Sequence, residues 1–458
     1  MKFSRTAIRC KTHALPTLRF EAQQLTSFSG LVVFQKLIEQ LGLKQRLRQC
    51  FVHLTVSPIF GHASIVLLLV VHLLLGFREL RHLRYYEEDP LVRRLLGLKR
   101  LPDISTVSRT LAGMDGESVA QLQHCLSAIV LERLQLLALK RVTLDFDGSV
   151  IGAGRFAEGT AVGFNRHKKG QRSYYPLFCT VAQTGQVLAL LHRSGNVHDS
   201  KGAQDFILGG IEQVKSALPG VSIEVRMDSA FFSDAIVGAL DKAGVDYTVS
   251  VPFERFSELK RHIEQRCYWY RLNPQSDGFE MRWKLRSWTR RHRFVFVRRE
   301  SKIQYKQPLQ LELFIPYEYG YEFTVILTNK SLTAANVVAF HHGRGSQEGI
   351  FGELKSHHQM DYVPTRTWHG NQIYLLSALL AHNLTRELQM IANPPSRSTQ
   401  HKRPALWVFE QMETLRRRLV QRAGRLIRPQ GHLTLSMSAN QAVENELLQY
   451  LDALEQAA

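Results

Sequence analysis

The sequence predicts a mixed α/β core that follows a helical N-terminal region and is interrupted by a mainly β insertion. Apolar residues recur at three- and four-residue spacing through about residue 136, as on one face of a helix. From Arg141 onward, strand-like runs alternate with short helical patterns, which is typical of a mixed sheet rather than a simple βαβ repeat. Basic, strand-like segments then break this pattern over residues 252–320. We therefore expect a helical region over residues 1–136, a first part of the core over 137–251, the insertion over 252–320, a second part of the core over 321–390, and a linker with a basic tail over 391–458.

The composition favours a polyanionic partner. The 458 residues include 59 Lys and Arg against 40 Asp and Glu, a formal net charge of +19, while the hydrophobic share of 44% is ordinary for a globular protein. The longest apolar run, Ile65 to Leu75, contains His72 and falls short of the roughly 20 residues that a membrane-spanning helix needs. The five cysteines are scattered without CxxC spacing, which argues against a disulfide scaffold or a zinc ribbon and for a reducing compartment. We expect a cytoplasmic protein that contacts nucleic acid and no membrane.

A capped helix is predicted near the end of the N-terminal region, in LPDISTVSRTLAGM (Leu101–Met114). Pro-Asp and a Ser/Thr cluster form a typical helix start, and Val107 and Leu111 follow at helical spacing. The other face would expose Ser105 and Arg109, as in the second helix of a helix-turn-helix that enters a DNA groove. An ordinary capped helix explains the same pattern, so both interpretations stay open.

The elements expected after residue 140 are separated by turn signals. The run RVTLDFDGSV begins as a strand at Arg141 and reaches a turn at Asp147-Gly148. The further elements are a hairpin of Tyr174–Val181 and Val187–Leu191, a strand over Ser222–Asp228, a helix over Asp234–Ala243, strands over Tyr247–Val251 and Phe323–Leu327, a long helical stretch from about Arg344 to Leu388, a linker over Pro394–Pro404, and a basic amphipathic helix over Trp407–Leu419.

Basic residues and tryptophans alternate in the expected insertion. Eight Lys and Arg lie between Met281 and Glu300, among them Arg286 and Arg290, and Trp283 and Trp288 stand between them. Such a segment can follow a phosphate backbone while aromatic rings stack on unpaired bases. A solvated β-hairpin whose tryptophans fill a small core explains the same residues. We favour DNA contact for the charges and core packing for the tryptophans.

Two acidic motifs stand at the ends of predicted strands. Asp145 and Asp147 close the run VTLDFD, and Asp228 closes SIEVRMD. A carboxylate at the end of a sheet strand projects from a rigid edge, where a metal site can be held in place. Each motif alone is equally explained by turn formation, because Asp-Gly is a good turn dipeptide.

A third acidic motif lies in HGRGSQEGIFGELKSHH (His342–His358), where Glu348 and Glu353 compete for the same role. At about 100° per residue, Arg344, Glu348 and Lys355 lie within roughly 60° of one another on a helix, whereas Glu353 points about 140° away from Glu348. That face would place a metal-binding carboxylate beside two cations that hold phosphates. Ordinary i,i+4 pairing between Arg344 and Glu348 on a surface helix explains the same spacing.

Three convergent carboxylates in a basic protein suit phosphodiester chemistry. Two Mg²⁺ ions about 3.5–4 Å apart can activate a water or a 3′-hydroxyl and stabilise the departing oxygen. Mg²⁺ prefers hard oxygen ligands, so carboxylates are the side chains expected to hold it. The three motifs together are therefore more informative than any one of them.

These motifs resemble a known family. DFDGSV, RMDSAFF and Arg344-x3-Glu348-x6-Lys355 are similar to motifs of bacterial insertion-sequence transposases of the DDE class, in the subgroup whose third motif is Tyr-x2-Arg-x3-Glu-x6-Lys. Residues 163–178 and 194–200 also resemble segments found between the two Asp motifs of that group. The resemblance covers roughly residues 140–390 and implies a ribonuclease H-like core with an insertion before the helix that carries the Glu.

The resemblance also implies an activity and the residues that perform it. The enzyme would bind the ends of its own element, nick DNA and join the freed 3′-hydroxyl to target DNA, in the cytoplasm at the nucleoid. Asp147, Asp228 and Glu348 would be the catalytic residues and would bind two Mg²⁺ or Mn²⁺ ions, while Arg344 and Lys355 would hold DNA phosphates. Synapsis of two ends implies a homodimer or a higher oligomer. 

One departure and two rival hypotheses accompany the resemblance. The Tyr position of the third motif is His341 here, and Asp145 has no place in the triad, although it could support Asp147. DFDGS also resembles the first motif of haloacid-dehalogenase-type phosphatases, in which Asp145 would be the nucleophile, but the late Gly-Asp-x3-Asp motif of that class has no match at the right spacing. A non-catalytic DNA-binding remnant or regulator would share the positive charge and the helix-turn-helix.

Overall fold

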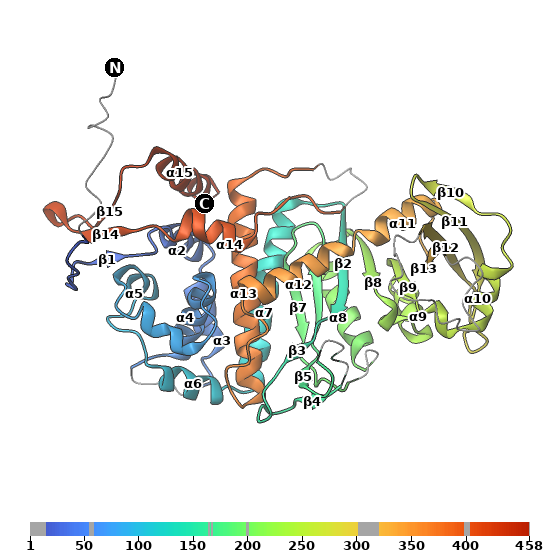
Figure 1. Cartoon of the computed structure of the whole chain (residues 1–458), viewed down its shortest axis with the longest axis horizontal. Helices are drawn as coiled ribbons and strands as arrows, with labels where there is room; N and C mark the ends of the chain where they lie inside the picture. Colours follow the sequence, from blue (N-terminus) through green and yellow to red (C-terminus); the bar gives the residue numbers. More distant parts are fainter. Residues whose placement is uncertain are drawn as a thin grey trace, which may run out of the picture.

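The computed structural model describes residues 15–54, 59–163, 165, 168–197, 201–300, 320–397 and 404–457. A helical part built from both ends of the chain, a central α/β core and a β-rich part follow one another along the long axis of the molecule (Figure 1). The segments 163–178 and 194–200, the insertion 252–320 and the linker 394–404 each include residues outside the described ranges.

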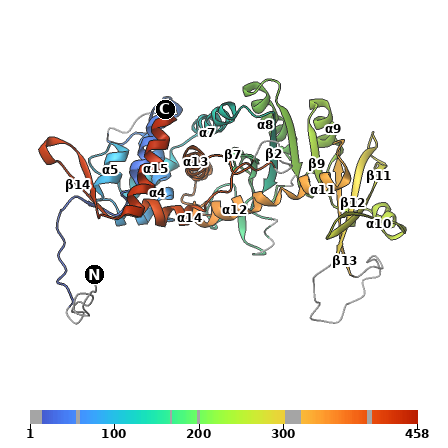
Figure 2. The ribbon, with the colours of Figure 1, turned by 90° about the horizontal axis from the view of Figure 1, so that it is seen from above.

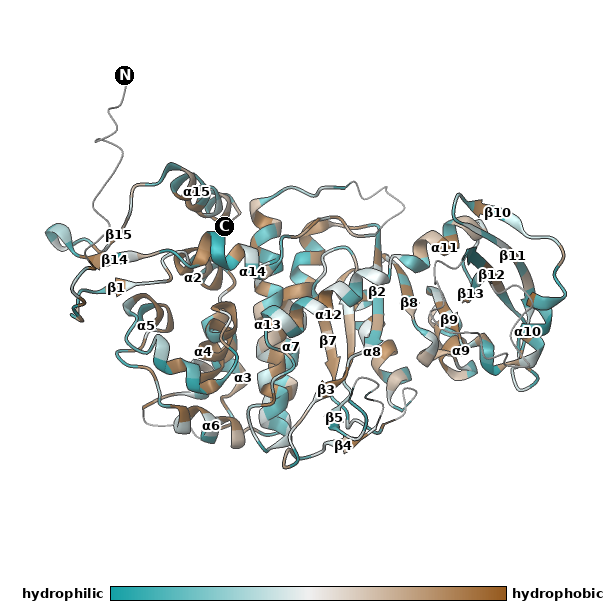
Figure 3. Ribbon diagram, viewed as in Figure 1, coloured by the Kyte–Doolittle hydropathy of each residue, from teal (hydrophilic) through white to brown (hydrophobic). Residues whose placement is uncertain are grey.

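The N-terminal region is helical, as predicted. Phe34 and Leu37 on one helix and Leu122 and Leu126 on another are fully buried, which confirms the apolar periodicity. The run from Ile65 to Leu75 forms a core helix that is apolar on nearly all sides (Figure 3). The elements are β1 (Leu25–Thr26), α2 (Leu31–Gln40), α3 (Leu43–Cys50), α4 (His62–Leu74), η1 (Leu80–Tyr85), α5 (Pro90–Leu96), α6 (Ile104–Ala112) and α7 (Gly116–Leu137).

No helix in the described part of the chain is long and apolar enough to cross a membrane.

One mixed sheet of nine strands runs through the core and the β-rich part, in the order β10-β11-β12-β13-β9-β8-β2-β6-β7. β2 (Arg141–Gly148) pairs antiparallel with β6 and parallel with β8, and β8 pairs parallel with β9. This mixed α/β class confirms the predicted fold class. The other core strands are β6 (Leu177–Val181), β7 (Val187–Leu191), β8 (Ser222–Met227), β9 (Asp246–Val251) and β13 (Tyr321–Thr328).

The two faces of the sheet carry different helices. α7, α8 (Ala203–Ala217) and α9 (Asp234–Ala243) cover one face, and α11 (Ala334–His342) and α12 (Gly345–His357) cover the other (Figure 2). In β2, Phe146 packs against Phe206 of α8, with ring centroids 5.8 Å apart. Because successive strand residues point to opposite faces, Asp145 and Asp147 point toward α12. A small sheet of β3 (Ile151–Gly152), β5 (Arg172–Tyr174) and β4 (Ala161–Val162) follows the end of β2.

The expected insertion continues the core sheet instead of forming a sheet of its own. β12 pairs antiparallel with β13, and β13 pairs antiparallel with β9 of the core, so the hydrogen-bonded ladder is unbroken. The aromatic rings of Phe279 and Phe296 stack at 4.4 Å in this part. Its elements are η3 (Phe253–Arg255), α10 (Ser257–Glu264), β10 (Tyr270–Asn273), β11 (Ser276–Trp283) and β12 (His292–Glu300).

The long helical stretch predicted from Arg344 to Leu388 is wrong as one helix. It divides into α12 and α13 (Trp368–Ala392), with residues 358–367 between them. Gln359 adopts a positive φ of 55°, and Pro364 disfavours a helical conformation at the residue before it, so the chain turns here. α13 is buried along most of its length and packs against α4, α7 and β7, which joins the helical part to the core.

The C-terminal segment returns to the helical part. The amphipathic helix predicted over Trp407–Leu419 lacks its first five residues, because residues 404–411 lie extended on the core, where the Leu406 amide donates to the Gln183 carbonyl at 3.1 Å. Helix begins only at Met412, and β14 then pairs with β1. The elements are α14 (Met412–Leu415), a π-turn over Arg416–Val420, β14 (Gly424–Ile427), η5 (Pro429–Gly431), β15 (Thr434–Met437) and α15 (Gln441–Gln456).

Candidate active site

Parallel pairing of β2 with β8 brings two distant carboxylates together. Asp145 pairs with Arg226 and Phe146 with Met227, so the next residues along each strand are Asp147 and Asp228. Asp228 caps η2 (Ser229–Phe231), and its carboxylate accepts a hydrogen bond from the Ala230 amide at 3.0 Å. The two aspartates, 81 residues apart in sequence, therefore lie side by side at the carboxyl ends of neighbouring parallel strands.

The electrostatics of this pair favour a cation. Burial, and after it the negative charge of Asp228, raise the pKa of Asp147 to about 7 against the opposing effect of Arg344. The Asp147 carboxylate is held by the Gly148 amide at 2.7 Å and by Arg344 Nη1 at 2.8 Å. A bound cation would relieve the repulsion between the two carboxylates, whose oxygens are the ligands that hard divalent ions prefer.

The start of α12 lies directly against the aspartate edge, by which we mean the carboxyl ends of β2 and β8 with Asp147 and Asp228. Arg344, the residue before the helix, reaches Asp147, and Gln347 Nε2 donates to the Asp145 carbonyl at 3.0 Å. Glu348 follows in the first turn of the helix with an exposed side chain, one turn after Arg344. The structure thus brings Asp147, Asp228 and Arg344 together, and Glu348 lies one turn beyond Arg344 on α12.

The structure distinguishes the two glutamates that competed in the sequence. Glu353 is buried, pairs with Arg386 of α13 and accepts a hydrogen bond from the Met412 amide at 3.0 Å. Its carboxylate is therefore engaged inside the protein, on a different side of α12 from Glu348. Lys355, further along α12, is half-buried, and burial lowers its pKa while Asp361 opposes this effect.

Asp145 has a structural environment. Its carboxylate accepts two hydrogen bonds from Arg226, at 2.6 Å from Nε and 2.7 Å from Nη2, and both side chains are completely buried. Arg226 Nη1 also donates to the Phe340 carbonyl at 2.9 Å, and a Cβ at Gly343 would collide with this guanidinium. This bidentate pair ties β2, β8 and α11 together beneath the aspartate edge and leaves Asp145 engaged where the phosphatase hypothesis needs a free nucleophile.

His341, at the position of the family Tyr, is also internal. It hydrogen-bonds the Thr248 hydroxyl at 2.9 Å and the Ser250 hydroxyl at 2.8 Å, which fastens α11 to β9. Burial, and after it the positive charge of Arg344, lower the pKa of His341 to about 3, so the ring is neutral at physiological pH.

The residues predicted to contact DNA occupy different surroundings. Arg286 is almost fully exposed in the β-rich part and lies 3.5 Å from Glu258, and Arg290 is exposed nearby. Trp288 is only 6% exposed and packs against Phe232 at 4.8 Å, so in this conformation it cannot stack on a base. Trp283 is half-buried against Phe294 at 5.3 Å.

On α6, Ser105 and Arg109 are exposed, as predicted. The Ser105 hydroxyl donates to the helix-capping Asp103 at 2.6 Å, so this serine contributes to the cap. α6 and the β-rich part lie toward opposite ends of the molecule, with the aspartate edge between them (Figure 1).

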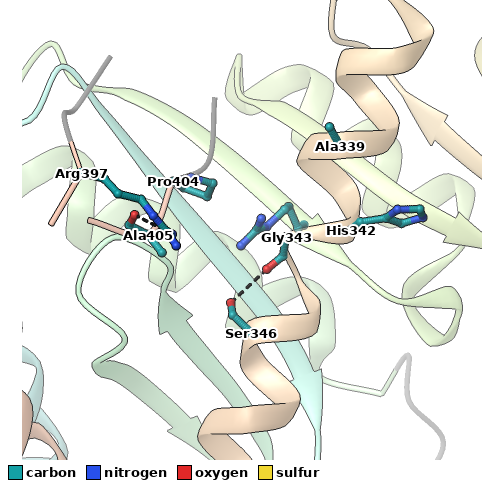
Figure 4. A pocket seen from close by; sticks show the side chains of 8 residues that line it. Ala339, His342, Gly343, Ser346, Arg397, Pro404 and Ala405 are labelled. Carbon is teal, nitrogen blue, oxygen red and sulfur yellow. Dashed lines mark hydrogen bonds between the residues drawn. The ribbon is translucent and has the colours of Figure 1, made fainter. Parts of the chain in front are cut away.

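Sequence reasoning missed Gln347, Arg226 and Arg397, an arginine side chain that lies beside the start of α12. A cavity of about 430 Å³ next to the start of α12 is lined by Ser346, His342 and Arg397, among others (Figure 4). Arg397 falls in the segment that the sequence predicted to be a linker. Its position depends on the amide of Arg397, which donates to the Leu406 carbonyl at 3.0 Å, a contact with no sequence signal.

A family model described as "Transposase DDE domain group 1" matches residues 12–458. The chain belongs to this family of DDE transposases. No match was found among curated proteins. The transposase is therefore an enzyme of DNA transposition, and the expectation drawn from the three acidic motifs is confirmed at this level.

Solved structures similar to the transposase include transposase complexes. A piggyBac transposase synaptic complex with hairpin DNA is 11% identical, with a TM-score of 0.40, and the match covers 84% of this chain and 79% of that one. A Mos1 mariner paired-end complex with Mn is 11% identical, with a TM-score of 0.18, covering 37% of this chain and 56% of that one.

DDE transposases use divalent metal ions. The residues at the aspartate edge of this transposase fit such ions, because burial and the neighbouring charge of Asp228 raise the pKa of Asp147, and a bound cation would offset both effects.

Proposed function

We propose that the transposase hydrolyses phosphodiester bonds at the ends of its own element and joins the freed 3′-hydroxyl to target DNA, with Asp147, Asp228 and Glu348 as the catalytic triad. The observation that carries this proposal is the register of β2 with β8, which aligns Asp147 with Asp228 under the helix of Glu348. We propose that these carboxylates hold two Mg²⁺ or Mn²⁺ ions. When bound, the ions activate a water or a 3′-hydroxyl and stabilise the leaving oxygen.

The side chains around the triad have separate tasks in this proposal. Arg344 neutralises Asp147 in the metal-free protein, and its guanidinium is close enough to the edge to hold a non-bridging oxygen of the DNA phosphate once the carboxylate binds a cation. Lys355 lies two turns beyond Glu348 on α12 and would hold a phosphate further along the strand. Asp145 and Arg226 contact no substrate and position the strand ends.

DNA would lie across several parts of the molecule. The exposed Arg286 and Arg290 would contact phosphates on one side of the triad, and Ser105 and Arg109 of α6 would contact a groove on the other. Trp283, partly exposed, is the one of the two tryptophans that remains a candidate for stacking on a displaced base. We further propose that two chains or more assemble to hold both ends of the element at the nucleoid.

The test uses duplex DNA that carries the native flanks of the gene, purified protein and Mg²⁺ or Mn²⁺. Glu348→Gln keeps the size of the side chain and removes its charge, and Glu444→Gln is the matched control, because Glu444 is also an exposed glutamate in the first turn of a helix. We expect metal-dependent cuts at two inverted flanking repeats for wild type and the control, and none for Glu348→Gln. Specific binding without cutting by any of the three proteins would favour a DNA-binding remnant instead.

A further inference from the structure

A second group of metal-ligand side chains lies on the far side of α12 from the aspartate edge. Glu353 of α12, His358 at the end of that helix and His382 of α13 each present one ligand atom, and these atoms all lie within 4.8 Å of one another. All three side chains are buried, with 7%, 0% and 0% of their surface exposed, respectively. None of them belongs to the proposed triad.

Three imidazole nitrogens in this group have no hydrogen-bond partner. They are both ring nitrogens of His358 and Nδ1 of His382. An unsatisfied buried polar atom destabilises the fold, so three at one place point to a ligand that satisfies them. His382 Nε2 lies 2.9 Å from the Gly185 carbonyl, which requires a proton on Nε2 and leaves a free lone pair on Nδ1 of the neutral ring.

The chemistry of the surroundings suits a metal ion. Both rings are completely buried, and a neutral imidazole is the form that binds metal. Arg386 and the Met412 amide hold the Glu353 carboxylate in place, as outer-shell partners do for ligating carboxylates. The charge of Arg386 is balanced by Glu353, and the other two ligands are uncharged.

We propose that Glu353, His358 and His382 bind a structural zinc ion, with water as the fourth ligand. Two imidazoles and one carboxylate are a ligand set that Zn²⁺ accepts in tetrahedral geometry, whereas Mg²⁺ prefers oxygen ligands in an octahedron. The ion would join the end of α12 to the middle of α13, and through Glu353 to the segment at Met412. It would thereby fix the helix that carries Glu348, and the inference does not depend on the proposed function.

The experiment uses the full chain, produced without a polyhistidine tag and freed of metal with EDTA. Zinc per chain after gel filtration, affinity from a competing chromophoric chelator, and the melting temperature with and without ZnCl₂ are measured for three proteins. These are wild type, His358→Asn, and a double variant, Asp147→Asn with Asp228→Asn, that removes the carboxylates of the other site. X-ray absorption at the zinc edge of loaded wild type reports imidazole ligands without any variant, should His358→Asn fail to fold.

We expect wild type and the double aspartate variant to bind one equivalent of zinc and to melt at a higher temperature with it. His358→Asn should bind zinc at least about 100-fold more weakly and gain no thermal stability from it. Zinc that disappears with the aspartates, zinc that survives in His358→Asn, or a zinc edge without imidazole scattering would each overturn the proposal. Wild type that binds no zinc would do so too, and would leave buried water as the partner of the three nitrogens.

Discussion

Replacing Asp147 by Asn should stabilise the metal-free transposase at pH 8. One pKa unit corresponds to about 1.4 kcal/mol, so the rise of the Asp147 pKa from 3.8 to about 7 means that its ionisation costs the folded protein about 4 kcal/mol. That shift already includes the attraction of Arg344, which lowers the pKa of Asp147. The gain of about 4 kcal/mol corresponds to about 4 °C for a chain of 458 residues unfolding as one unit.

The stability difference between Asp147→Asn and wild type should depend on pH. The pKa of Asp147 is higher in the folded than in the unfolded protein, so the proton favours folding, and this contribution is lost as pH rises from about 4 to about 7. The advantage of Asp147→Asn over wild type should therefore be largest at pH 8, much smaller at pH 5, where folded wild type already carries the proton, and absent below about pH 4. Adding Mn²⁺ at pH 8 should raise the melting temperature of wild type and leave the variant unchanged.

Thermal melts in EDTA at both pH values, with Asp205→Asn as the control for an exposed aspartate, measure the effect. The reasoning is refuted if Asp147→Asn melts below wild type at pH 8, or if the difference between the two is the same at pH 5. Either result would mean that Arg344 fully offsets the free-energy cost of burying the ionised Asp147 carboxylate, so that its ionisation does not destabilise the folded protein.

Other substitutions separate catalytic from structural side chains. Glu353→Gln should destabilise the fold by about 3–5 kcal/mol, because it breaks a buried ion pair. Glu348→Gln should stop DNA cutting and change stability by less than about 0.5 kcal/mol, because the side chain is exposed. Urea unfolding of both variants measures the difference. Arg286→Ala combined with Arg290→Ala should reduce the salt dependence of DNA binding by about 2 in its logarithmic slope while the melting temperature stays constant; an unchanged slope would exclude these residues from the interface. Trp288→Ala should cost about 3–5 kcal/mol of stability, and a variant as stable as wild type would show that the indole is not part of the core.

Local sequence patterns predicted the elements that the site is built from, because each pattern has a local physical cause. The helix over Asp234–Ala243 and the hairpin on either side of Gln183-Thr184-Gly185 both form where spacing and turn residues placed them. The third motif also separated Glu348 from Glu353 by angle alone, and burial of Glu353 agrees with that separation.

Features that depend on contacts between distant segments were not predictable. The turn between α12 and α13 comes in a stretch whose apolar spacing continues a helix, and only Pro364 and the positive φ of Gln359 interrupt it. Residues 407–411 belong to a predicted helix but lie extended with the residues before them, because the Gln183 carbonyl and the Gln389 side chain bind the backbone of Leu406 and Glu410. The pairing of Asp145 with Arg226 was likewise hidden, since it depends on the register of two strands 81 residues apart.

The continuous sheet holds the β-rich part in a fixed position relative to the proposed active site. Four inter-strand steps lead from β2 through β8, β9 and β13 to β12, and at about 4.8 Å a step these strands lie roughly 19 Å apart. DNA rises 3.4 Å per base pair, so this separation corresponds to about six base pairs. Arg286 and Arg290 precede β12, whose Arg293 is level with Asp145 through the register of these strands, so phosphates bound there would lie more than six base pairs from a bond cut at Asp147. Hydrogen-bonded strands, not a flexible linker, set that spacing. DNA that is bound to the β-rich part would therefore be held in one position relative to the proposed triad, and this position can select which bond at the end of the element is cut.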